Sequence, residues 1–152
     1  MKNENQKDAL LTLKEAGIAK TSQRLAVLNI LLTATMPLSA NTIRQNLQTQ
    51  ASIDKVTVYR ILSRFKQSGI IREIASAGGA NYFEMATLEN PLHPHFSCRN
   101  CGTFTCLAPL SFTQAPELIL PKDDYSIDHI EINISGLCAG CRNATNQQKT
   151  MI

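Results

Sequence analysis

Four of the five cysteines form two CxxC pairs. The first pair is Cys98 and Cys101, and the second, which follows after 36 residues, is Cys138 and Cys141. Each pair places two thiolates on a tight turn, and two such turns together form the closed, all-thiolate tetrahedral site that suits Zn2+. Because the gap exceeds the roughly 15–20 residues of a simple zinc ribbon, a small sheet must lie between the pairs. We therefore expect these cysteines to hold a structural zinc.

A second group of metal-ligand types stands apart from these pairs and consists of Glu84, His93, His95 and Cys106. The two histidines are two residues apart, so in an extended segment both rings point the same way. Two imidazoles, one carboxylate and one thiolate would form a tetrahedral site for a borderline-soft ion, with Zn2+ ahead of Fe2+ or Mn2+. The simpler alternative is that the cysteine is a small buried apolar residue and the glutamate is solvated.

A third set of residues lies on a helix expected from about Asp54 to Gln67. On a wheel of about 100° per residue, one side of this helix is apolar and predicts a core face of Val58, Ile61, Leu62 and Phe65. The other side offers what a helix in the DNA major groove uses, namely arginines and hydroxyls for phosphates and apolar groups for thymine methyls. This side comprises Val56, Thr57, Tyr59, Arg60, Ser63, Arg64 and Gln67. A merely solvated charged face is the alternative.

The surrounding elements must position this helix. The sequence predicts three earlier helices: one over Asp8–Ala16 that Gly17 ends, one from a Thr21 or Ser22 cap to about Thr33, and one over residues 40–47. Two strands, over residues 70–75 and 81–85, follow the fourth helix and are joined by a glycine-containing turn. Four helices and a hairpin in this order predict a winged helix-turn-helix.

The charge and the ligand types divide the chain near Pro91. Residues 1–90 carry 11 Lys and Arg against 7 Asp and Glu, whereas residues 91–152 carry 4 against 5 and contain all three histidines and all five cysteines. We expect a DNA-binding domain over 1–90 and a zinc-containing dimerisation domain over 91–152. The second domain should be an α/β module with strands over 103–107 and 127–134 and a helix over 111–120. The fold class is thus α+β, and because the module is small we expect a homodimer.

Several classes of protein are excluded by composition. With 43% hydrophobic and 18% charged residues, the 152-residue chain can form packed cores and is not a disordered tail. No apolar run approaches the ~20 residues of a membrane span, and the N-terminus has no export signal, so we expect a cytoplasmic protein.

A thiol oxidoreductase using one CxxC is a rival, but the sequence places neither pair at a helix N-terminus after a parallel strand. No catalytic constellation is present, so we do not expect an enzyme.

Six stretches together resemble the ferric uptake regulator (Fur) family of bacterial metal-responsive repressors. They are residues 21–24 with Ala16-Gly17 before them, 57–62, 69–71, 82–84, 93–102 and 136–141. The resemblance implies a winged-helix DNA-binding domain, a hinge, a dimerisation domain with a four-cysteine zinc, and a regulatory metal site at the hinge. It further implies that metal-loaded dimers bind AT-rich inverted-repeat operators in double-stranded DNA and repress transcription.

Carried over by position, the resemblance assigns roles to individual residues. Tyr59 reads bases and Arg60 contacts phosphates on a helix that begins near Lys55, and Lys14 is the basic residue available to the minor groove. Glu84, His93 and His95 match the regulatory ligands. Cys106 stands where many members have a glutamate ligand, and its thiolate favours zinc, which points to the zinc uptake regulator (Zur) subtype.

Departures from the family pattern bear on the metal. Leu92 and Pro94 occupy positions where many members have ligands of a further metal site, so we expect that site to be absent. Residues 34–38 lack the histidine that iron sensors tend to use, which argues against an iron sensor. The alternatives are an iron, manganese or peroxide sensor of the same family, or a DNA-binding protein that is stabilised by a structural zinc and has no sensing role.

Overall fold

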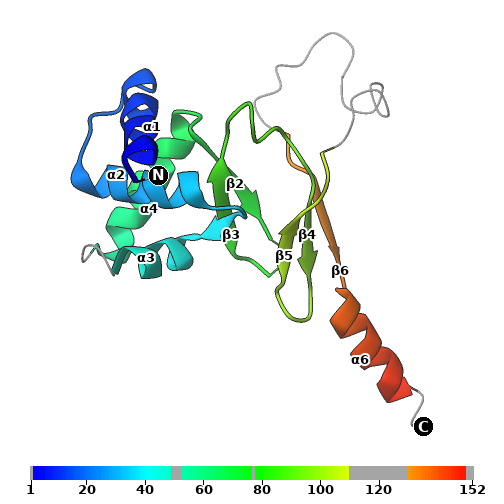
Figure 1. Ribbon diagram of the computed structural model, residues 1–152. Helices are drawn as coiled ribbons and strands as arrows, with labels where there is room; N and C mark the ends of the chain where they lie inside the picture. Colours follow the sequence, from blue (N-terminus) through cyan, green and yellow to red (C-terminus); the bar gives the residue numbers. More distant parts are fainter. Residues whose placement is uncertain (1, 49–52, 77, 110–129, 150–152) are drawn as a thin grey trace. The chain divides into compact units, whose positions relative to one another are not determined.

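Figure 1 shows the computed structural model, which describes residues 2–48, 53–76, 78–109 and 130–149. The chain forms two units, one of Met1–Ala75 with Ala80–Asn90 and the other of Ser76–Gly79 with Pro91–Ile152. None of the helices among the described residues has the length and apolar character that a membrane span requires.

The first unit contains four helices whose ends are set by local hydrogen bonds. They are α1 (Lys2–Glu15), α2 (Ser22–Thr33), α3 (Ala40–Gln48) and α4 (Lys55–Gln67). Gly17 ends α1 with a positive φ of 64°, which a residue with a side chain rarely adopts. The N–H of Arg24 donates to the Thr21 hydroxyl at 3.2 Å and caps α2. The N–H of Thr57 donates to the Asp54 carboxylate at 2.9 Å and caps α4 in the same way.

A small antiparallel sheet completes the first unit. Its strands are β1 (Leu38–Ser39), β2 (Ile71–Ala75) and β3 (Asn81–Met85), in the order β1-β3-β2. The hairpin of β2 and β3 is the expected wing, whereas the two-residue β1 was not expected from the sequence. Helices followed by this hairpin form a winged helix-turn-helix, as predicted.

The core of the first unit is built from the apolar sides of its helices. The predicted core face of α4 is confirmed, since Val58, Ile61, Leu62 and Phe65 are all buried. They pack in one cluster with buried residues of the other helices, among them Leu13 of α1, Leu28 of α2 and Ile43 of α3. Burying this side of α4 leaves its opposite side at the surface.

The second unit is built on a three-stranded sheet with a helix after it. Its elements are β4 (His95–Cys98), β5 (Phe104–Cys106), β6 (Asn133–Gly136) and α6 (Ala139–Lys149). The order is β5-β4-β6, with β5 antiparallel and β6 parallel to the central β4. Together with the first unit this gives the expected α+β class.

Two expectations for the second unit need correction. The strand predicted over 127–134 pairs with β4 only from Asn133 to Gly136, because the register matches Asn133 to His95 and Gly136 to Cys98. Residues 130–132 precede the strand, and residues 127–129 and the helix predicted over 111–120 lie outside the described part of the chain. The strand predicted over 103–107 is shorter by one residue at each end.

Candidate metal centres and nucleic-acid interface

The parallel pairing of β4 and β6 brings the two CxxC pairs together. Cys98 is the last residue of β4 and pairs with Gly136, so the chain leaving β6 reaches Cys138 beside it. Cys101 lies in the tight turn after β4, where Gly102 has a φ of 74° and its N–H donates to the Cys98 carbonyl at 3.0 Å. Cys141 lies in the first turn of α6.

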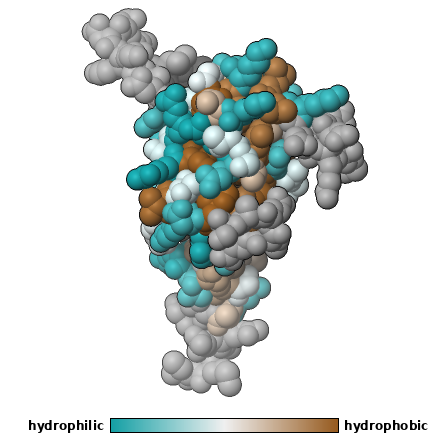
Figure 2. Space-filling view, turned by 90° about the vertical axis from the view of Figure 1, so that its left-hand side faces the viewer, coloured by the Kyte–Doolittle hydropathy of each residue, from teal (hydrophilic) through white to brown (hydrophobic). Residues whose placement is uncertain are grey.

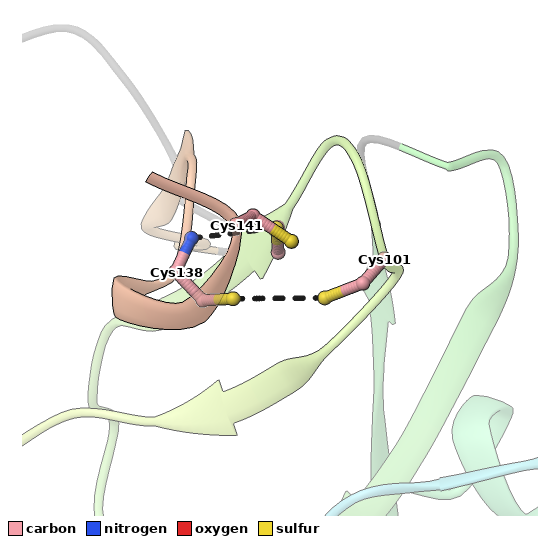
Figure 3. A group of neighbouring side chains, drawn as sticks. Cys101, Cys138 and Cys141 are labelled. Carbon is pink, nitrogen blue, oxygen red and sulfur yellow. Dashed lines mark hydrogen bonds between the residues drawn. The ribbon is translucent and has the colours of Figure 1, made fainter. Parts of the chain in front are cut away.

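The four sulfur atoms form a cluster of the size that one zinc ion requires. All lie within 4.8 Å of one another. The Sγ atoms of Cys101 and Cys138 face each other at 3.7 Å (Figure 3). In a tetrahedral site with Zn–S bonds of about 2.3 Å, the sulfurs are about 3.8 Å apart. The donor set therefore fits a four-thiolate zinc site, and all five cysteines of the chain are free thiols.

Backbone amides around Cys98 favour the thiolate, which is the form that binds metal. The N–H groups of Cys101 and Cys138 lower the pKa of the Cys98 thiol to about 6. The Cys138 N–H donates to the Cys98 sulfur at 3.3 Å. At Cys141 the neighbouring sulfurs outweigh a hydrogen bond from Asn100 and raise the pKa of the thiol to about 11. A cation at the centre would remove this mutual repulsion between the sulfurs.

The expectation that neither pair begins a helix after a parallel strand was wrong for the second pair. Cys138 directly precedes α6, and α6 follows the parallel strand β6. The sequence did not reveal this helix because Ala139–Lys149 lacks an apolar stripe. The arrangement nevertheless differs from a redox dithiol, because the sulfurs of Cys98 and Cys101 close the cluster from the other side.

Three donors of the second predicted group also converge within the second unit. His95 of β4 lies directly opposite Cys106 of β5 in the antiparallel ladder, and His93 is two residues before His95. Their donor atoms lie within 4.8 Å of one another, and the rings of His93 and His95 are 4.5 Å apart between centroids. The His95 ring stacks on Phe104 at 5.3 Å, which fixes its orientation. The sequence did not predict β4, whose pairing places these side chains together.

The hydrogen bond of His93 fixes which ring nitrogen can bind a metal. Its Nδ1 lies 2.8 Å from the Pro91 carbonyl oxygen. A carbonyl can only accept, so Nδ1 carries the proton and Nε2 of the neutral ring keeps its lone pair. The Nε2 atoms of both histidines are buried. Two nitrogens and one sulfur thus form a donor set typical of Zn2+.

Glu84, the fourth member of the predicted group, lies on β3 of the first unit. Its side chain is buried and pairs with Arg72, whose Nη2 is 2.9 Å from the Glu84 Oε1. Arg72 stands opposite Glu84 in the β2–β3 ladder. Sequence reasoning missed this arginine, because its position opposite Glu84 depends on the register of the hairpin.

The surface of α4 displays the predicted DNA-binding residues. Val56 and Tyr59 are 60% and 46% exposed, which leaves their side chains available to a partner. Arg60 and Arg64 are exposed, and Lys55 places its Nζ 5.8 Å from the centre of the Tyr59 ring. Thr57 is committed to the cap of α4, because its hydroxyl donates to Asp54 at 2.5 Å. Lys14 is exposed in the last turn of α1, on a different helix.

The fold agrees with comparisons to known proteins. A family model described as the ferric uptake regulator family matches residues 15–135. The chain belongs to this family. Members of the Fur family are metal-responsive transcription regulators and not enzymes, and they bind DNA and metal.

Relatives of known role include peroxide regulators. The chain is 28% identical over 141 residues to the peroxide operon regulator of Bacillus subtilis (strain 168), across 92% of this chain and 95% of that protein. It is 27% identical over 137 residues to the peroxide-responsive repressor PerR of Staphylococcus aureus (strain Mu50), across 90% of each.

Solved structures of the Fur family share the fold. The ferric uptake regulator of Vibrio cholerae is 27% identical with a TM-score of 0.67, over 84% of this chain and 98% of that one. The Helicobacter pylori regulator has a TM-score of 0.72 at 18% identity, over 92% and 93% of the two chains, and shows the fold alone.

Proposed function

We propose that this Fur-family regulator is a zinc-sensing transcriptional repressor. The observation that carries the proposal is the convergence of His93, His95 and Cys106, separate from the four-cysteine cluster. Two donor sets of different composition suit two tasks. Four thiolates form a closed structural site, and a mixed set with fewer thiolates holds an ion that can exchange.

The donor types favour zinc as the regulatory ion. A thiolate from Cys106 beside two imidazoles is softer than the oxygen-rich sets that Mn2+ prefers. We propose Glu84 as the fourth ligand, because its position matches a regulatory ligand of the family and a carboxylate completes a tetrahedral zinc site.

DNA is the partner that the surface of α4 suits. Val56 and Tyr59 would meet thymine methyls and base edges in the major groove, and the arginines would meet phosphates. Lys14 would reach the minor groove. Two copies of α4 in a homodimer would read an AT-rich inverted repeat with half-sites about one helical turn apart.

We assign residues 1–90 to DNA binding and residues 91–152 to dimerisation. In the described part of the second unit, β6 is an edge strand and Ile134 on it is 44% exposed, which suits a surface that a second copy covers. We expect a cytoplasmic location, because a repressor must reach its operator on the chromosome.

Repression by zinc requires a difference in affinity between two states of the dimer. Zinc must bind more tightly when the two copies of α4 match successive grooves than when they do not. A shift from 1% to 99% of the matching state needs a preference of about 10^4-fold.

Metal content measured with DNA binding tests this function. The purified protein is analysed for zinc per subunit before and after mild chelation, and DNA binding is followed in parallel. We expect one zinc to remain and one to be lost, with DNA binding lost and then restored by zinc. A single inert zinc with unchanged DNA binding would refute a sensing role.

A peroxide sensor is the second candidate, because the relatives of known role described above are peroxide regulators. The same stripped dimer separates the two. Restoration by Fe2+ or Mn2+ in place of zinc, followed by loss of DNA binding on treatment with hydrogen peroxide, would favour the second candidate.

A further inference from the structure

A surface pocket of about 310 Å³ lies between the start of α2 and one side of α4. Its polar lining comprises Thr21, Gln23 and Arg24 from the α2 side and Thr57, Arg60 and Arg64 from α4. Three of these residues are arginines and none is acidic. The helices that form the pocket lie on the left of Figure 1 and face the reader in Figure 2, where hydrophilic side chains project from this face.

The pocket residues of α4 form a stripe that differs from the exposed apolar one. At about 100° per residue, Thr57, Arg60 and Arg64 fall within about 60° of one another around the helix, and Val56 and Tyr59 lie on the same side of this group, about 75° and 135° from its centre. The exposed surface of α4 is therefore divided into an apolar stripe and a cationic stripe. Only the cationic stripe borders the pocket.

The positive charge of the pocket is not balanced by acidic lining residues. Arg24 is half-buried, and its Nη1 donates to the Ala19 carbonyl at 2.6 Å, which holds the guanidinium in place. The first turn of α2 contains no acidic residue. The carboxylate of Asp54, close along α4, already accepts hydrogen bonds from the amide and the hydroxyl of Thr57. The guanidinium groups, the Gln23 amide and the Thr21 hydroxyl are donors that suit a tetrahedral oxyanion, and no acidic residue lines the pocket.

We propose that this pocket binds one phosphate of the DNA backbone while the apolar stripe of α4 meets the bases. This inference rests on the proposed DNA-binding function and adds to it a single anchoring site that joins two helices. Clamping one phosphate between α2 and α4 would fix how deeply α4 enters the groove, because phosphate contacts set register and orientation on the duplex. Gln23 and Arg24, which no sequence motif assigned to DNA, thereby become DNA-contacting residues.

A double-mutant cycle tests whether the two helices share one phosphate. The probe is a duplex selected from random DNA by the zinc-loaded dimer. We expect Arg64→Gln to weaken binding about tenfold and to lower the slope of log affinity against log salt by about one. Gln23→Ala, which leaves the Thr21 cap intact, should weaken binding several-fold. The double variant should lose less DNA affinity than the product of the two single losses, because both side chains act on the same phosphate.

A lysine of the same helix supplies the matched control. Lys66 lies on α4 outside the pocket, where it pairs with Glu73. Lys66→Gln removes one charge from α4. The fold loss of DNA affinity in the double variant of Lys66 and Gln23 should equal the product of the two single losses. Multiplicative effects for Gln23 and Arg64, or an unchanged salt slope for Arg64→Gln, would overturn the shared phosphate.

The source of the phosphate is tested with modified DNA and with inorganic phosphate. Methylphosphonate replacement at successive positions should reveal one phosphate whose loss weakens the wild type but not Arg64→Gln. We compare inorganic phosphate with chloride at equal ionic strength. Phosphate should raise the melting temperature of the wild type by no more than it raises that of Arg64→Gln. A selective rise would identify a free anion as the ligand and overturn the assignment to DNA.

Failure of this inference can be told from failure of the proposed function. The cycle is repeated on the metal-stripped protein at low salt. Coupling between Gln23 and Arg64 without any dependence on zinc would refute sensing and leave the pocket intact. Zinc-dependent binding without coupling would refute the pocket alone.

Discussion

Arg72 and Glu84 form an ion pair across strands β2 and β3 of the wing. The Arg72 Nη2 and the Glu84 Oε1 are 2.9 Å apart, and the two side chains are only 18% and 7% exposed. The same guanidinium donates from Nε to Glu84 at 3.0 Å and from Nη2 to the Asn90 carbonyl at 2.6 Å. One arginine thus ties a proposed zinc ligand to the last residue of the first unit.

Arg72→Met should destabilise the metal-stripped protein markedly. Removing one partner leaves the Glu84 carboxylate buried without its cation, and such losses cost about 3–5 kcal/mol in the free energy of unfolding. Urea denaturation, followed by a signal from the first unit, measures the change.

An exposed ion pair between α4 and β2 serves as the control. Lys66 and Glu73 form an ion pair in which the lysine side chain is 56% exposed. Lys66→Met should change the free energy of unfolding by no more than about 1 kcal/mol, because solvent screens the charges. If Arg72→Met and Lys66→Met lowered the free energy of unfolding by similar amounts, burial of the Arg72–Glu84 pair would not explain its contribution.

Cys98→Ser and Cys106→Ser should damage the protein in different ways. The first removes a sulfur from the four-cysteine cluster, so the second unit should lose its tightly held zinc and the folding free energy that the zinc supplies. The second removes a donor from the proposed regulatory site, so one zinc per subunit should remain while the zinc needed to restore DNA binding rises at least tenfold. Elemental analysis and circular dichroism report on the first effect, and DNA binding against free zinc on the second. Equal loss of fold in both variants would refute the division between a structural and a regulatory site.

The sequence predicted the first unit well because its elements are specified locally. The four buried residues of α4, Val58 to Phe65, follow the helical period, and the caps at Thr21 and Asp54 are local signals as well. The register that places Arg72 opposite Glu84 depends on the turn between β2 and β3, which a pattern of residue types does not determine.

The second unit was harder to predict because distant pairings define it. His95–Cys98 became the central strand through neighbours on both sides, one of them beginning at Asn133. Its residues alternate between polar and apolar over only four positions, which is the lower limit of a strand signal. The ligand types themselves were readable, since the spacing of Cys98 and Cys101 and of His93 and His95 is a local feature. Their convergence into two donor sets required the sheet.

The carboxyl group of Asp54 should titrate below its usual pKa. The hydroxyl and then the amide of Thr57 donate to it and stabilise the ionised form, which lowers the pKa from 3.8. A lowered pKa in the folded state stabilises the protein above the unfolded value, and this contribution is lost as the pH falls through the folded pKa. The cap of α4 should therefore weaken only below about pH 4, the unfolded value of an aspartate.

Substitutions at Thr57 check the cause of this shift. Thr57→Val removes the hydroxyl and should raise the pKa of Asp54, whereas Thr57→Ser keeps the hydroxyl and should leave it low. Carbon-detected NMR titration of the Asp54 carboxyl gives both values. The same pKa in both variants would show that the hydroxyl does not contribute.

Val56 and Arg60 should affect DNA binding through different terms. Val56 is 60% exposed on the apolar stripe of α4, so Val56→Ser should reduce the preference for thymine at one position of each half-site. The expected cost at that position is about 1 kcal/mol, which lies at the low end for one base contact, and the salt dependence should not change.

Arg60→Gln removes a charge and should weaken binding to all sequences alike, with a salt slope smaller by about one. Competition among duplexes with single base changes, at several salt concentrations, separates the two terms. A changed salt slope for Val56→Ser, or a changed base preference for Arg60→Gln, would show that the two stripes of α4 do not divide base reading from phosphate binding.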